Sequence, residues 1–164
     1  MRVQTITMTM LLALPMSLPA APDDAAEPAK PPPADQRLER LVGQYQIVEG
    51  AKDGTAIPPE RLKNNTVAIT RDTIAVVDPD RKELYSARYK LGPENDQGIA
   101  QINMRSESPK EGASAVGLLK RDGEQLWLIY ALDGQRPKNF EKTIEGQHLF
   151  KMKRKQEAEE PTEP

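Results

Sequence analysis

The apolar residues in the middle of the chain recur mostly at every second position, and this period predicts β-strands. In the first such segment, Tyr45 and Ile47 alternate with Gln44 and Gln46. The same alternation occurs in residues 66–70, 85–91 and 100–105. It is typical of a sheet with one buried face and one solvated face. Residues 126–132 are instead apolar on both faces, so we expect the outer face of this strand to be covered as well.

Turn signals separate these apolar segments, because Pro presets φ, Asp and Asn bond the local backbone, and Gly accepts a positive φ. The predicted chain reversals are Asp78-Pro79-Asp80, Gly92-Pro93-Glu94-Asn95, Asp122-Gly123 and Asp133-Gly134. The Asp122-Gly123 pair gives the strongest hairpin signal.

Two short helices are also predicted. Asp35 is suited to cap a helix that ends at Leu41, and a second helix has proline in its first turn, at Pro58 and Pro59, and runs through Leu62. Because these helices are short and the remaining elements are strands, we predict an all-β domain. About eight antiparallel strands in about 120 residues favour a small up-and-down β-barrel, because closure removes exposed sheet edges.

Residues 1–21 have the features of a signal peptide. Residues 6–18 are largely apolar, but this run is shorter than the roughly 20 residues that a membrane-spanning helix needs. An uncleaved N-terminal anchor is the alternative. We therefore predict an exported protein that is periplasmic, associated with the cell envelope or secreted, with no transmembrane segment in the mature chain.

The remaining residues predict one folded domain between two polar segments. Residues 22–34 are rich in Pro and Ala and are interpreted as a semi-stiff linker. Residues 156–164 are acidic, contain proline, and are expected to form a disordered tail. Residues 35–155 are left for the barrel, which is the size of a single domain. We expect this domain to be a monomer.

Composition and charge exclude several classes of function. The 164-residue chain has 23 basic and 25 acidic residues, which are interspersed, so nothing indicates a nucleic-acid partner. It has no cysteine, so disulfides and thiolate metal sites are excluded.

Candidate catalytic and metal-binding residues are also few. The single histidine, His148, is interpreted as a residue at the end of a strand near the barrel rim rather than as a catalytic base. The acidic turn at Asp78, Asp80 and Glu83 lacks the glycine and the distal glutamate of a calcium loop. We predict no enzyme, no metal and no cofactor.

Four short motifs, in a particular order and spacing, resemble those of a family of small lipocalin-like, calycin-type domains found in planctomycete bacteria. The motifs are Gly43-Gln44-Tyr45, residues 53–62 beginning with Asp53-Gly54, Arg136-Pro137-Lys138-Asn139-Phe140, and the closing strand at residues 150–154. The resemblance implies a lipocalin-like barrel but no particular activity. The chain departs from the family pattern at Tyr45, where Trp is usual, and at Ile129, where many members have Cys.

The resemblance also implies that a last-strand arginine packs against the first-strand aromatic residue and plugs one end of the barrel. The residues support this independently, because Arg154 shares strand parity with Phe150 and Met152 and should point inward. A contact of Arg154 with the ring of Tyr45, next to Gly43, would be a cation–π interaction worth about 0.5–2 kcal/mol.

The Arg136-Pro137 corner allows two interpretations. It could belong to a binding mouth. We favour a structural role, in which Pro137 ends a strand, Arg136 satisfies loop carbonyls and Phe140 anchors the corner in the core.

Two alternatives remain open for the barrel interior. It could hold a small apolar or amphipathic ligand, or it could be packed solid, which we favour, leaving the outer face to bind a partner protein of the cell envelope. In that case the partner, or the N-terminal helix, would cover the outer face of residues 126–132. The residues predicted to line a ligand cavity are the larger side chains of the central strands: Tyr85, Tyr89, Met104, Trp127 and Tyr130.

Overall fold

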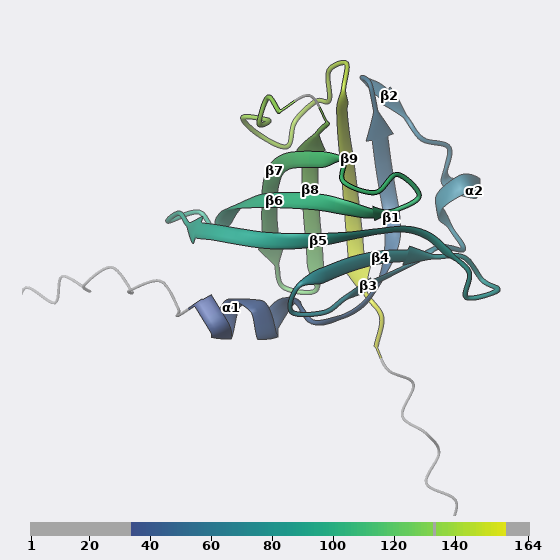
Figure 1. The fold of residues 1–164 in the computed structure, drawn as a ribbon, viewed down its shortest axis with the longest axis horizontal. Helices are drawn as coiled ribbons and strands as arrows, with labels where there is room; N and C mark the ends of the chain where they lie inside the picture. Colours follow the sequence, from purple (N-terminus) through teal and green to yellow (C-terminus); the bar gives the residue numbers. More distant parts are fainter. Residues whose placement is uncertain (1–33, 133, 157–164) are drawn as a thin grey trace, which may run out of the picture. The chain divides into compact units, whose positions relative to one another are not determined.

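The computed structural model describes residues 34–132 and 134–156. Within these residues, nine antiparallel strands follow one another in the order β2-β1-β3-β4-β5-β6-β7-β8-β9, and β1 also pairs with β9. That last pairing closes eight of the strands into a barrel, with the two-residue β2 attached to one end of β1, and it confirms the predicted all-β barrel (Figure 1). The strands are β1 (Gly43–Lys52), β2 (Thr55–Ala56), β3 (Thr66–Ile69), β4 (Thr73–Val77), β5 (Glu83–Glu94), β6 (Ile99–Ser108), β7 (Ser114–Asp122), β8 (Gln125–Ala131) and β9 (Gln147–Arg154).

The two predicted helices are present. Helix α1 (Ala34–Leu41) begins one residue before the predicted cap, so Asp35 lies inside its first turn. Helix α2 (Pro59–Leu62) has proline at its first position, as predicted. None of the helices in the described part of the chain is long and apolar enough to span a membrane. The predicted signal peptide, linker and tail lie outside the described residues, apart from Ala34 and Gln156.

The hairpin at Asp122-Gly123 is confirmed, since Asp122 pairs with Gln125. The reversal predicted at residues 92–95 comes later. Strand β5 continues through a bulge at Gly92-Pro93, which an irregular ladder tolerates. The chain turns at residues 95–98, where Asn95 Oδ1 accepts hydrogen bonds from the backbone N–H of Gln97 and of Ile99, at 3.0 and 2.9 Å. Asp133 is outside the described residues.

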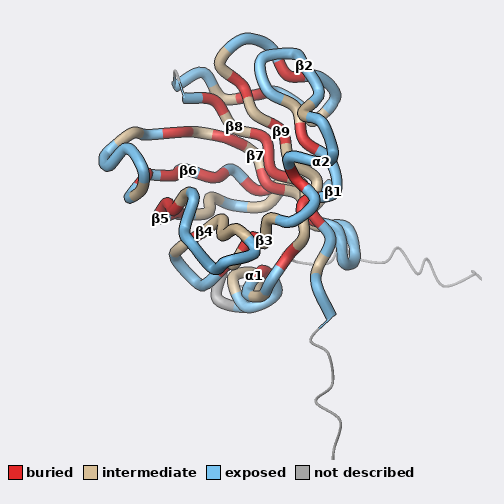
Figure 2. Tube along the Cα trace, turned by 90° about the vertical axis from the view of Figure 1, so that its right-hand side faces the viewer, coloured by how far each residue is buried: buried red, intermediate tan, exposed pale blue. Residues whose placement is uncertain are grey.

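The barrel core follows the period of two that the sequence predicts. Buried positions recur at every second residue along strands such as β6 and β7 (Figure 2). In β6, for example, Ala100, Ile102 and Met104 are buried, whereas Gln101 and Asn103 are exposed. Sixteen buried side chains form one hydrophobic cluster inside the barrel.

The outer face of β7 and β8 is covered by the connection between β8 and β9, and not by the N-terminal helix. Phe140 packs edge-on against Trp127 with a centroid distance of 6.2 Å. Pro137 is buried. Arg136 donates to Gln101 Oε1 and Asn103 Oδ1, both at 2.8 Å, and thereby reaches across β7 to β6. We call residues 134–146 the outer flap.

This arrangement corrects three predictions for the Arg-Pro corner. Pro137 does not end a strand, because β8 has already ended at Ala131. Arg136 binds side-chain oxygens rather than loop carbonyls. Phe140 lies against the outer face of β8 and not in the barrel core. The physical reason is that a strand that is apolar on both faces needs a second cover, and this segment provides it.

Candidate functional site

The barrel encloses a cavity of about 400 Å³ at the end where the β1–β2 hairpin and α2 lie. This size falls within the range of small-molecule sites, about 300–1,000 Å³. We call it the mouth cavity. Aromatic and sulfur-containing side chains form much of its wall: Tyr85, Met104, Tyr130, Phe150 and Met152. Aliphatic side chains from the strands and from the β2–α2 segment complete it, including Ile47, Ile57, Leu62, Val76 and Leu128.

Three of the five predicted cavity residues line this cavity, namely Tyr85, Met104 and Tyr130. They come from β5, β6 and β8, which are not all neighbouring strands, so closure of the barrel brings them together. The predicted parity of these strands was sufficient to find them, because each lies at an inward position.

Tyr89 does not line the mouth cavity. It points inward, but it is 5% exposed and lies deeper in the barrel, where its hydroxyl donates to the Thr70 carbonyl at 2.8 Å. Burial, with a smaller contribution from Asp72, raises the pKa of Tyr89 to about 12. This tyrosine is therefore part of the packed core.

Trp127 does not line the mouth cavity either, because it lies on the outer face of β8. Its ring contacts Phe140 of the outer flap, and Lys151 Nζ lies 4.5 Å from the ring centroid. In β8 the side chains that face the barrel interior are those of Leu126, Leu128 and Tyr130. The prediction that Trp127 also faces the interior was therefore wrong.

A packed layer separates the mouth cavity from the opposite end of the barrel. Along β6, Ala100 borders a second pocket, Ile102 is fully buried, and Met104 borders the mouth cavity. Strand β5 follows the same order, with Leu91 at the second pocket and Tyr85 at the mouth cavity. The buried residues that line neither pocket include Tyr45, Ile69, Ala87, Tyr89 and Leu126. The interior is therefore filled in the middle and hollow at both ends.

The rim of the mouth cavity carries polar and basic groups. Lys52, Arg61 and Asn65 line its edge, and no carboxylate is among its lining residues. Lys52 Nζ lies 4.0 Å from a carboxylate oxygen of Asp53. Arg61 is exposed. An anionic or neutral polar group at this rim would meet two cations.

His148 lies beside this rim, as predicted. Its ring stacks on Tyr130 with a centroid distance of 4.9 Å and an interplanar angle of 11°. Burial, helped by the positive charge of Lys52 and opposed by Asp53, lowers the pKa of His148 below its usual 6.5. The ring is therefore mainly neutral at pH 7. Burial likewise raises the pKa of Tyr130 and of Tyr85.

The opposite end of the barrel is closed by the predicted arginine–tyrosine contact. The guanidinium carbon of Arg154 lies 5.5 Å from the centroid of the Tyr45 ring. Arg154 also donates to the carbonyls of Arg40 and Val42, at 3.0 and 2.6 Å, and these residues end or follow α1. Gly43 leaves room for it, since a Cβ there would lie 3.2 Å from Arg154 Nη2.

Sequence reasoning missed part of the cavity wall. Ile57 and Leu62 come from the β2–α2 segment, which shows no strand period, and only closure of the barrel places them over the mouth. Phe150 and Met152 were recognised as inward residues of the last strand but were not assigned to the cavity. Within residues 34–132 and 134–156, no group of three or more His, Asp or Glu side chains is arranged to hold a metal ion.

A scan against protein-family models and searches of curated proteins and of solved structures found no match. The resemblance to planctomycete lipocalin-like domains therefore stays a prediction.

Proposed function

We propose that this protein is an exported, non-catalytic binding protein that holds a small apolar or amphipathic molecule in the mouth cavity. The observation that carries the proposal is the cavity of about 400 Å³, walled almost entirely by aliphatic, aromatic and Met side chains. Apolar side chains that line an empty space lose the dispersion contacts of a packed core, and an apolar ligand restores them. The two Met side chains can adapt to different shapes.

The rim indicates how an amphipathic ligand would be oriented. Its apolar part would occupy the space between Met104 and Phe150, and its polar group would lie at the edge, near Lys52 and Arg61. Two cations and no lining carboxylate favour an anionic group over a cationic one. A medium-chain carboxylate meets both requirements.

The alternative of a solid barrel acting as a scaffold is less well supported. It predicted that a partner, or the N-terminal helix, would cover the outer face of residues 126–132, but the outer flap covers that face through Pro137 and Phe140. The hollow mouth also removes the reason to assign all binding to the outside.

The test is native mass spectrometry of the full chain expressed in a bacterium and recovered from the periplasm, where its presence also tests export. The protein would be titrated with decanoic acid, decanol and decyltrimethylammonium. We expect one molecule to bind per chain, with decanoic acid tightest and the ammonium compound weakest. Because Trp127 faces outward, tryptophan emission should barely respond to binding.

A matched pair of variants places the ligand. Val76→Phe adds a ring inside the mouth cavity and should abolish binding. Val48→Phe makes the same change on the outside of the barrel, where Val48 is 54% exposed, and should leave binding unchanged. The proposal is wrong if the folded protein binds none of the three compounds, or if Val76→Phe binds as the unmodified protein does.

A further inference from the structure

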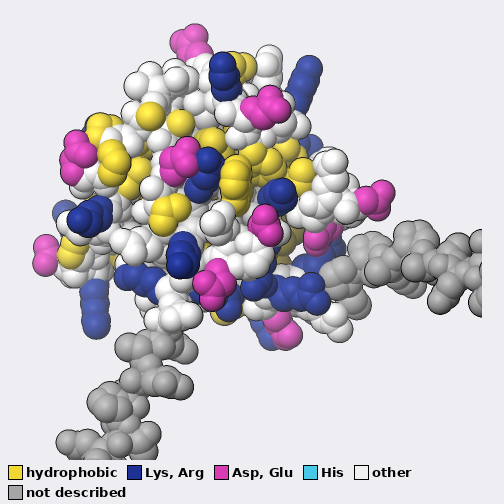
Figure 3. All heavy atoms as spheres, turned by 180° about the vertical axis from the view of Figure 1, so that it is seen from behind, with side chains coloured by type: hydrophobic (Ala, Val, Ile, Leu, Met, Phe, Trp, Pro, Cys, Tyr) yellow, Lys and Arg dark blue, Asp and Glu magenta, His cyan; other side chains and the backbone are white. Residues whose placement is uncertain are grey.

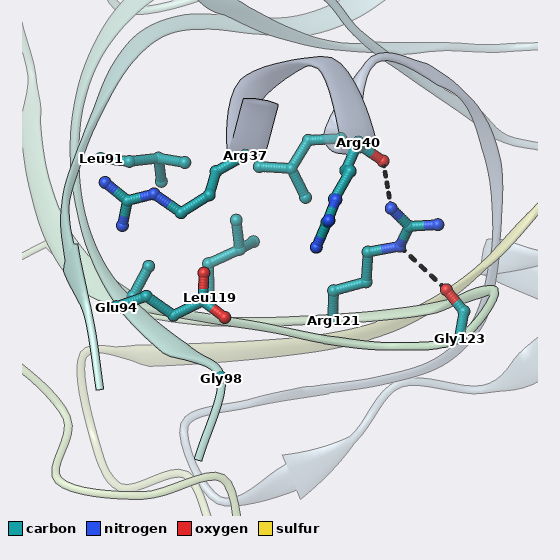
Figure 4. Close-up of a pocket in the computed structure, with 10 residues that line it drawn as sticks. Arg37, Arg40, Leu91, Glu94, Gly98, Leu119, Arg121 and Gly123 are labelled. Carbon is teal, nitrogen blue, oxygen red and sulfur yellow. Dashed lines mark hydrogen bonds between the residues drawn. The ribbon is translucent and has the colours of Figure 1, made fainter. Parts of the chain in front are cut away.

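The closed end of the barrel has a pocket of its own, of about 470 Å³, which shares no lining residue with the mouth cavity. Three arginines line it (Figure 4). Arg37 and Arg40 come from α1 and Arg121 comes from β7. Glu94 of β5 is the one carboxylate among the lining residues. Lys and Arg side chains also form a band along the lower margin of the domain in Figure 3, the side on which Figure 1 shows α1.

The floor of this pocket is apolar. Leu41, Leu91, Ala100 and Leu119 line it below the arginines. Leu119 and Arg121 lie two positions apart on β7, so they share a face of that strand, and the apolar floor continues directly into the basic wall. The pocket can therefore accept a molecule that has a charged part and an apolar part.

The guanidinium groups have donors to spare. Arg121 donates from Nε to the Gly123 carbonyl at 2.9 Å and from Nη1 to the Arg40 carbonyl at 2.7 Å. Its Nη2 makes no hydrogen bond to any residue in 34–132 or 134–156. Arg37 donates from Nη1 to the Gly92 carbonyl at 3.2 Å. Among the residues that the structure describes, the Arg40 side chain has no hydrogen-bond or ion-pair partner, and Glu94 is in no ion pair.

These contacts also make the arrangement stiff. Arg121 is held at two carbonyls, and the carbonyl of Arg40 is held in turn by both Arg121 and Arg154. The end of α1 is therefore fixed, and with it the backbone from which Arg40 extends. The Arg121 guanidinium, held at two carbonyls, can therefore bind an oxyanion with little loss of its own side-chain entropy.

We propose that this pocket binds a small organic anion with an oxyanion group and a compact apolar remainder, and that a phosphate monoester is the best-fitting class. Guanidinium groups match the oxygens of phosphate through paired N–H donors. Three cations against one carboxylate leave an excess of two positive charges, which suits a dianion. The apolar floor would contact the organic part of the ester.

Isothermal titration calorimetry of the full chain tests the proposal, with phenyl phosphate, inorganic phosphate and phenol as probes. We expect phenyl phosphate to bind more tightly than inorganic phosphate and phenol not to bind. The affinity should fall when the salt concentration is raised. The proposal would be overturned if phenyl phosphate at concentrations up to about 10 mM gave no heat of binding. This concentration is well above the dissociation constant of about 1 mM that is typical of a weak site.

Variants separate this site from general charge effects. Arg40→Gln should weaken phenyl phosphate binding about tenfold or more, because a charge-assisted hydrogen bond is lost. Arg105→Gln removes the same charge from the exposed face of β6 and should leave binding unchanged. Glu94→Gln removes the repelling carboxylate and should tighten binding several-fold.

Each result has a definite meaning. Equal losses for Arg40→Gln and Arg105→Gln would show binding through net charge alone and would overturn the proposal. Glu94→Gln keeps it testable if Arg40→Gln does not fold, because failure of Glu94→Gln to tighten binding would also contradict the site. Decanoic acid binding at the mouth should be unaffected by Glu94→Gln, so failure of one site is distinguishable from failure of the other.

Discussion

The two ends of this barrel are built from the same strands but have opposite chemistry. At the closed end, arginine side chains bind the carbonyls that end α1, and a basic pocket lies beneath the helix. At the mouth, aromatic, aliphatic and Met side chains surround an apolar cavity, and cations occur only at the rim. On β6, Ala100 lines the basic pocket and Met104, only four positions further along, lines the mouth cavity. If both proposals hold, one small barrel holds two different classes of ligand.

The connections outside the barrel explain this difference. Helix α1 precedes β1 and brings Arg37 and Arg40 to one end of the barrel. It also brings the carbonyls of Arg40 and Val42 there, where Arg121 and Arg154 donate hydrogen bonds to them. The β2–α2 segment brings Ile57 and Leu62 to the other end. The packed layer between them, which contains Ile102 and Tyr45, prevents the two pockets from merging.

The largest effect should come from removing the closed-end aromatic residue. Tyr45 is 1% exposed and its hydroxyl donates to the Leu41 carbonyl at 2.8 Å. We expect Tyr45→Ala to lower the free energy of unfolding by about 3–5 kcal/mol, as for other large-to-small changes in a core. Tyr85→Ala, which enlarges a cavity that already exists, should cost only about 1–2 kcal/mol. Urea denaturation measures both.

Tyr45→Phe serves as the control, because it keeps the ring and removes only the hydroxyl, at an expected cost of about 1 kcal/mol. If Tyr45→Ala and Tyr85→Ala proved equally destabilising, the mouth would be packed as tightly as the closed end, and the contrast between the two ends would be lost.

The second prediction concerns the arginine that closes this end. Arg154→Ala should lower the free energy of unfolding by about 1–3 kcal/mol, because it leaves two carbonyls with one fewer donor and removes the cation over Tyr45. Arg154→Lys should restore less than half, since an ammonium group lacks the planar fork. Thermal melting measures the series. Arg105→Ala, at an exposed position, should change stability by less than about 0.5 kcal/mol. An unchanged melting temperature for Arg154→Ala would show that the contacts of Arg154 with Tyr45 and with the two carbonyls do not stabilise the fold.

The contact of Arg154 with Tyr45 at the closed end could be predicted from the sequence more completely than the mouth cavity. Strand parity alone placed Arg154 and Tyr45 on the inner face, and the resemblance to lipocalin-like domains implied that they meet. Parity also placed Tyr85, Met104 and Tyr130 correctly. Parity gives the face of a strand but not the depth along the barrel axis, and for that reason Tyr89 was expected at a cavity that it does not reach.

The outer face explains the remaining errors. A strand that is apolar on both sides gives no signal for which side is the barrel interior, so Trp127 was assigned to the wrong face. The outer flap has no regular period, and its contacts through Arg136 and Phe140 depend on residues far along the chain. The basic pocket was not predicted either. Arg37 and Arg40 lie far from Arg121 in the sequence, and only closure of the barrel and docking of α1 bring them together.

The smallest predicted effect is a pH response that originates at the mouth alone. His148 is the single histidine of the chain, and its folded pKa is lowered from 6.5, mainly by burial. Between that lowered pKa and 6.5 the unfolded chain binds more protons than the folded one, so stability is complete above about pH 6.5 and falls on acidification. We expect the unmodified protein to lose up to a few degrees, roughly, in melting temperature between pH 7 and pH 5 relative to His148→Gln. Parallel melting curves for the two proteins would mean that the ring on Tyr130 is as well solvated as in the unfolded chain. If the melting temperature of the unmodified protein instead rose on acidification relative to His148→Gln, the effect of Asp53 on the pKa of His148 would outweigh that of burial. The surroundings of His148 would then be polar rather than apolar.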